Sequence, residues 1–77
     1  MLSYEECKSI AAQIASGHDA KLVKAYQIRN DYVFEAAGEW AGVFPVVVFS
    51  ENGDTMGLWQ YLERFDLTWD DLVEKGY

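Results

Sequence analysis

The sequence is poor in the residues that disulfide and metal chemistry require. It contains a single cysteine, Cys7, and a single histidine, His18, among 77 residues. One cysteine cannot form an internal disulfide, so we expect a reducing, cytoplasmic environment. One histidine excludes a zinc site built from several histidines. We expect Cys7 to be an ordinary core residue, because it lies on an apolar helical stripe.

Basic residues are also scarce. Lys and Arg number 6 against 13 Asp and Glu, which gives a formal net charge of −7. A surface of this sign repels phosphate backbones and anionic lipids, so we expect no nucleic-acid or membrane partner. No apolar run approaches the roughly 20 residues that span a bilayer. The N-terminus carries Glu5 and Glu6 where a signal peptide needs basic residues, so we expect no targeting signal. The partner that this charge attracts is a basic protein.

Large apolar side chains are abundant instead. Hydrophobic residues make up 51% of the chain and aromatic residues 16%. This composition and length predict a single small globular domain over residues 1–77. So short a chain buries only about 60% of its unfolded surface. We therefore expect some aromatic surface to be available to a partner.

The first half predicts a helix followed by a hairpin. Ser3 and Glu6 have the spacing of a capping box, which favours a helix over residues 4–16. Gly17 then supplies a left-handed residue that ends it. Residues 22–37 alternate as two strands do. We expect a three-residue loop at Arg29–Asp31, because this register keeps the aromatic residues on one face.

The second half predicts a further hairpin and short helices. Residues 43–50 read as a strand that is apolar on both faces, as in a central strand. Asn52-Gly53 is a strong two-residue hairpin signal, which would pair Phe49 with Met56. Helical spacing then favours a helix over 58–65, with a continued strand as the alternative. Thr68 has the position of an N-cap, which favours a last helix over 68–75. The fold class is α+β: an N-terminal helix, an antiparallel meander of three to four strands, and one or two short C-terminal helices, with the helices on one face.

The candidate contact residues are tryptophans and exposed carboxylates. Trp is enriched at binding hot spots, although both candidate tryptophans could instead cover the small core. The acidic side chains of the last segment read as helix caps and a solvated face rather than a catalytic cluster. The residues that we expect to contact a partner are Trp40, Trp59, Glu51, Asp54, Asp70, Glu74 and Tyr77.

We expect no catalytic residue, no cofactor and no metal ligand. The stretch Ser50–Gly57 provides two carboxylates and a turn, whereas an EF-hand loop needs alternating oxygen ligands and a closing Glu. Cys7 and His18 lie at opposite ends of one predicted helix. They are too far apart to act as a nucleophile and its base.

Five short motifs resemble those of small PepSY-like and toxin-immunity-like bacterial α+β proteins. Those families have an S-x-E-E helix start, an aromatic strand, a valine-rich strand, an x-G-D/E turn and a closing helix. The matching segments here are Ser3–Cys7, Tyr32–Glu35, Val46–Phe49, Asn52–Asp54 and Tyr61–Glu63. The tail from Thr68 to Tyr77 departs from the pattern. The resemblance implies a binding or inhibitory role and assigns no functional residue.

The leading hypothesis is a small, acidic, non-enzymatic protein-binding module, such as an inhibitor or immunity-like protein of a basic partner. One alternative is a structural or self-associating component of a phage or mobile-element assembly, for which a homodimer is the simplest form. Another is a small-molecule-binding domain. That alternative requires a pocket that holds two titratable groups within reach of each other.

Overall fold

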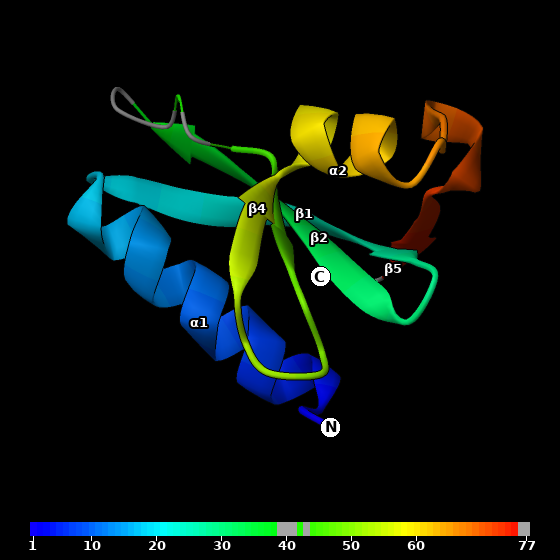
Figure 1. Ribbon diagram of the computed structural model, residues 1–77. Coiled ribbons are helices and arrows are strands. Elements are labelled where there is room, and N and C mark those ends of the chain that lie inside the picture. Colours follow the sequence, from blue (N-terminus) through cyan, green and yellow to red (C-terminus); the bar gives the residue numbers. More distant parts are fainter. Residues whose placement is uncertain (39–41, 43, 76–77) are drawn as a thin grey trace.

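Figure 1 shows a computed structural model of the chain, which describes residues 1–38, 42 and 44–75. The elements run α1 (Tyr4–Gly17), β1 (Ala20–Ile28), β2 (Asp31–Gly38), β3 (Val46–Val48), β4 (Thr55–Gly57), α2 (Leu58–Arg64), a 3₁₀ turn η1 (Trp69–Asp71) and β5 (Val73–Lys75). The strands form one antiparallel sheet in the order β4-β3-β2-β1-β5. The α+β class is confirmed, with five strands rather than three or four.

Helix α1 begins as its sequence predicts. The Ser3 N–H donates to Glu6 Oε1 at 3.0 Å, and the Glu6 N–H donates to Ser3 Oγ at 3.1 Å. The bond from the Ser3 N–H favours the ionised carboxylate and, together with the Ser3 side chain, lowers the pKa of Glu6. The left-handed assignment of Gly17 is wrong: Gly17 is the last helical residue, His18 is the C-cap, and Asp19 has the positive φ of 53°. Aspartate tolerates this conformation better than most residues.

The two helices cover opposite faces of the sheet, so the prediction of helices on one face is wrong (Figure 1). One core cluster joins α1 to alternate strand residues; its buried members are Cys7, Ala11, Ala15, Leu22, Ala25, Phe34, Val46 and Val48. The other joins α2 to the remaining strand positions and consists of Ile28, Val33, Val47, Leu58, Tyr61 and Leu62. Strand β3 is buried at every position, as its apolar run predicts.

The β1–β2 hairpin has a two-residue turn, not the predicted three-residue loop. Ile28 pairs with Asp31, so Arg29 and Asn30 form the turn, and Arg29 adopts φ 55°. The predicted register grouped the aromatic residues on one face. That constraint does not apply here, because both faces of the sheet are covered. The observed register places Asp31 in the strand, where its carboxylate is buried.

The β3–β4 hairpin is present, but its register is also shifted. Val47 rather than Phe49 pairs with Met56, and the Phe49 N–H donates to the Asp54 carbonyl at 2.8 Å. The Ser50 N–H donates to Asp31 Oδ1 instead of a hairpin partner, and the Leu2 N–H donates to the Ser50 carbonyl. These bonds to other parts of the chain hold Ser50 outside the ladder.

The C-terminal segment differs most from its prediction. Helix α2 is confirmed, but the expected helix over 68–75 is the short turn η1 followed by strand β5. The cap of that turn forms as predicted: the Thr68 N–H donates to Asp71 Oδ2 at 2.8 Å. Beyond the turn, β5 pairs with the outer edge of β1, with Glu74 opposite Tyr26. An unpaired edge leaves backbone donors and acceptors without partners, which favours the added strand.

Gly53, the glycine of the β3–β4 loop, should be hard to replace. It has φ +81°, and an added Cβ would lie 3.0 Å from Ile10 Cδ1 and 3.1 Å from Leu2 Cδ1. We expect Gly53→Ala to lower the free energy of unfolding by about 1–2 kcal/mol. Gly17→Ala is the matched control, because an added Cβ there meets no atom within 4 Å and a helical Ala is favoured by about 0.5–1 kcal/mol. Urea denaturation of both variants measures the difference, and equal stabilities would contradict the prediction.

Candidate functional site

A buried carboxylate joins three separate segments of the chain. Asp31 is only 9% exposed. Its Oδ1 accepts the Ser50 N–H at 3.0 Å and its Oδ2 accepts the Tyr61 hydroxyl at 2.7 Å. The Ser50 hydroxyl in turn donates to the Asn30 carbonyl at 2.6 Å. These hydrogen bonds therefore connect the β1–β2 turn, the β3–β4 loop and helix α2 around the Asp31 carboxylate.

Two guanidinium groups lie beside this network. The Arg29 Cζ lies 4.1 Å from the centroid of the Phe65 ring, and the Arg64 Cζ lies 5.6 Å from the same centroid. Arg29 Nη1 is also 3.5 Å from the Tyr61 hydroxyl oxygen, to which it donates. Neither guanidinium pairs with a carboxylate within residues 1–38, 42 and 44–75. Both therefore keep N–H donors available to a ligand.

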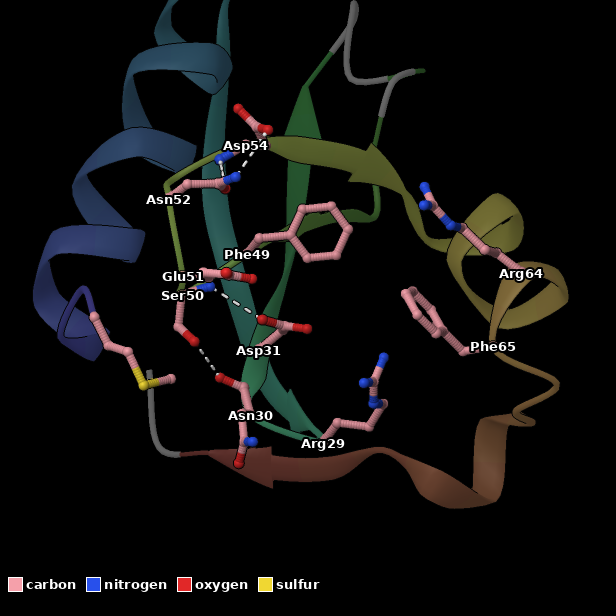
Figure 2. A pocket seen from close by; sticks show the side chains of 11 residues that line it. Arg29, Asn30, Asp31, Phe49, Ser50, Glu51, Asn52, Asp54, Arg64 and Phe65 are labelled. Atoms are coloured by element: carbon pink, nitrogen blue, oxygen red, sulfur yellow. Dashed lines mark hydrogen bonds between the residues drawn. The ribbon is translucent and has the colours of Figure 1, made fainter.

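An open hollow of about 650 Å³ lies above these residues. Figure 2 shows the arginines and Phe65 on one side of it, Glu51 and Asp54 on the other, and Phe49 between them. The Asp31 carboxylate lies on its floor. The hollow is lined by Met1, Arg29, Asn30, Asp31, Phe49, Ser50, Glu51, Asn52, Asp54, Arg64 and Phe65. The hollow is thus lined by side chains of both charges and by two aromatic rings.

A second exposed feature is a pair of tryptophans. Trp59 on α2 is 60% exposed and Trp69 in η1 is 44% exposed. Their ring centroids are 5.0 Å apart at an interplanar angle of 75°, an edge-to-face contact. The predicted contact residues include Trp59 but not Trp69. The acids Asp70 and Asp71 that follow Trp69 in the cap were the available signal that this segment faces solvent.

The other predicted contact residues that the structure describes do not gather at one place. Trp40 and Tyr77 lie outside the described residues. Asp70 follows Trp69, and Glu74 lies on β5. Glu51 and Asp54 both line the hollow. The sequence could not foresee that Arg29, Asp31, Arg64 and Phe65 join them there, because those residues come from a turn, a strand and the end of a helix.

The side chains of the β3–β4 loop are ordered among themselves. The Asp54 N–H donates to Asn52 Oδ1 at 2.9 Å, and Asn52 Nδ2 donates to Asp54 Oδ2 at 3.1 Å. An Asx turn of this kind explains the Asn-Gly-Asp stretch without any ligand. Within the described residues, no three His, Cys, Asp or Glu side chains form a cluster that could hold a metal ion.

Burial shifts the pKa of two groups near the network. Loss of solvation raises the pKa of Tyr61 from 10.0 to about 12, and the hydrogen bond to Asp31 adds to the effect. Loss of solvation also raises the pKa of the Cys7 thiol, with a further contribution from the Asp31 charge. Cys7 is fully buried, as expected of a core residue. A buried thiol of raised pKa is unreactive at neutral pH.

Comparisons with known family models, curated proteins and solved structures found no match for this chain. The resemblance to PepSY-like and toxin-immunity-like proteins therefore stays a prediction. In the described part of the chain, no helix has the length and apolar character needed to cross a membrane.

Replacing Asp31 should separate the loss of an acceptor from the loss of a charge. Asp31→Ala leaves the Ser50 N–H and the Tyr61 hydroxyl without their acceptor. We expect it to lower the free energy of unfolding by about 3 kcal/mol. Asp31→Asn keeps one carbonyl for Ser50 and offers an N–H to the tyrosine oxygen, so its loss should be about 1 kcal/mol. Urea denaturation measures both values, and an equal loss would show that the hydrogen bonds are not the cause.

The raised pKa of Tyr61 predicts an alkaline loss of stability. Below pH 10 the phenol is protonated in both states, so it contributes no pH dependence there. Between pH 10 and about 12 the unfolded state releases this proton more readily than the folded state, so stability falls as pH rises. Tyr61→Phe should remove this component of the slope. Urea denaturation at several alkaline pH values, with titration of the tyrosinate absorbance, checks it; identical slopes in the two proteins would contradict the assignment.

Proposed function

We propose that the chain is a non-enzymatic protein-binding module that uses Trp59 and Trp69 as its anchor. The observation that carries this proposal is that two large aromatic side chains remain exposed and contact each other on the surface. Trp combines a large apolar area with an N–H donor and is enriched among residues that dominate binding energy. A partner that covers both rings gains more than one that covers an isolated aromatic residue.

The anchor is held in place before any partner arrives. Trp59 projects from α2, which is fixed to the core by its buried residues Leu58, Tyr61 and Leu62. Trp69 lies in the capped turn η1, and the edge-to-face contact restricts both rings. Side chains that are already ordered lose less conformational entropy on binding. The pair is therefore suited to recognition of a defined surface.

Charge selects a basic protein as the partner. Glu63 lies one helical turn after Trp59, on the same side of α2. Asp70 and Asp71 follow Trp69 directly and are exposed. The chain as a whole carries −7, which steers a cationic surface toward it and accelerates association at low salt. An inhibitor or immunity-like protein acts in this way when the basic surface that it covers is the partner's functional one.

The Trp pair should matter for binding far more than for folding. For Trp59→Ala/Trp69→Ala we expect the loss of about 1 kcal/mol of stability, or roughly 4–8 °C in melting temperature. We expect the same variant to abolish capture of a basic protein from host lysate. The unsubstituted protein should capture this partner less strongly at high salt. Val23→Ala, which changes another exposed apolar residue, should leave capture intact.

Two outcomes would overturn this proposal. One is a partner that is retained by the double tryptophan variant. The other is a dimer mass in solution that the same variant converts to a monomer mass, with no other protein captured. The second result would favour a self-associating structural component instead.

A further inference from the structure

We propose that the hollow between the β3–β4 loop and the end of α2 binds a small zwitterionic ligand of the amino-acid class. Its carboxylate would face Arg29 and Arg64, and its ammonium group would face Asp31, with Glu51 and Asp54 at the rim. The site lies apart from the Trp59–Trp69 pair and does not depend on the protein-binding role. Three observations support it. Charges of both signs line the hollow, the buried Asp31 carboxylate can accept further hydrogen bonds, and two aromatic rings offer apolar surface.

The arginines supply the wall that receives a carboxylate. The chain contains only two arginines, at positions 29 and 64, and both lie against the Phe65 ring. Packing on an aromatic ring orients a guanidinium while leaving N–H groups free for a planar acceptor. A carboxylate matches that geometry with two hydrogen bonds. The chain carries a net charge of −7, yet both of its arginines line this hollow. This local positive charge favours a carboxylate as the bound group.

Asp31, on the floor of the hollow (Figure 2), supplies the strongest feature that would receive an ammonium group. It is a nearly buried carboxylate that accepts one neutral donor at each oxygen, from Ser50 and from Tyr61. An ionised carboxylate can accept about four hydrogen bonds. No ammonium or guanidinium group pairs directly with it in the described part of the chain. Arg29 reaches this carboxylate only through the shared Tyr61 hydroxyl. An ammonium group in the hollow would bond it directly, with Glu51 and Asp54 adding negative charge at the rim.

The combination of charges excludes simpler ligands. A plain anion would meet the repulsion of Asp31, Glu51 and Asp54. A plain cation or a metal ion would meet the repulsion of the two arginines. Only a ligand that carries both charges is attracted by both walls (Figure 2). The half-buried rings of Phe49 and Phe65, each packed on Tyr61, add apolar surface for a side chain. The volume of about 650 Å³ is typical of small-molecule pockets.

Three related compounds test the requirement for both charges. L-phenylalanine carries both groups, L-phenylalaninamide only the ammonium, and N-acetyl-L-phenylalanine only the carboxylate. Each would be titrated into the ¹⁵N-labelled full chain and followed by ¹H–¹⁵N correlation spectra. Because the chain has two arginines, their Nε–Hε signals report directly on the cationic wall. We expect L-phenylalanine to shift these signals and the amides of the β3–β4 loop, with an affinity at least about tenfold higher than either single-charge compound.

Matched variants tie the binding to this hollow. Arg64→Gln should weaken L-phenylalanine binding about tenfold. Lys24→Gln removes the same charge from an exposed position on β1 and should change nothing. Trp59→Ala/Trp69→Ala should also bind L-phenylalanine normally, so failure of the protein-binding role and failure of this site are distinguishable. Equal binding of N-acetyl-L-phenylalanine, an effect of Lys24→Gln as large as that of Arg64→Gln, or no shift at millimolar L-phenylalanine would overturn the proposal.

Discussion

The burial of the Asp31 carboxylate is the constraint on which the rest of the structure depends. A charged group removed from water must find hydrogen-bond donors, or the fold loses several kcal/mol. Here the donors are the Ser50 N–H and the Tyr61 hydroxyl, which come from distant parts of the chain. Satisfying one side chain therefore fixes the turn between β1 and β2, the loop between β3 and β4, and the position of α2. Both hairpin registers follow from this requirement.

The two-sided sheet explains how so short a chain accommodates so many large side chains. With α1 on one face and α2 on the other, alternate residues of the same strand enter different core clusters. Each cluster is small, and large rings that do not fit remain at its border. Phe49 and Phe65 border the hollow in this way, whereas Trp59 and Trp69 lie on the surface. The exposed aromatic surface is thus a consequence of core size. It lies at two places, the hollow and the Trp59–Trp69 pair, on which the two binding proposals rest.

Charge distribution distinguishes those two places. The tryptophan pair is accompanied by acidic residues on α2 and η1, which suits a basic macromolecule. The hollow is lined by two arginines, three carboxylates and two phenylalanine rings, which suits the small dipolar molecule that we propose. Asp31 lines the hollow, whereas the Tyr61 hydroxyl that donates to it at 2.7 Å belongs to a fully buried side chain that does not line the hollow. Both sites use α2, since Trp59 lies near its beginning and Arg64 at its end.

The sequence by itself determined the features that depend on neighbours along the chain. The Ser3–Glu6 capping box, the buried β3 run, helix α2 and the cap at Thr68 all formed as local spacing predicted. Tertiary structure decided which side chains meet. It shifted both hairpins, because Asp31 and Ser50 found partners across the sheet, and it replaced a final helix by β5, because the edge of β1 had backbone groups to pair. It also assembled the hollow, because hydrogen bonds and ring contacts between distant residues leave no periodic signal in the sequence.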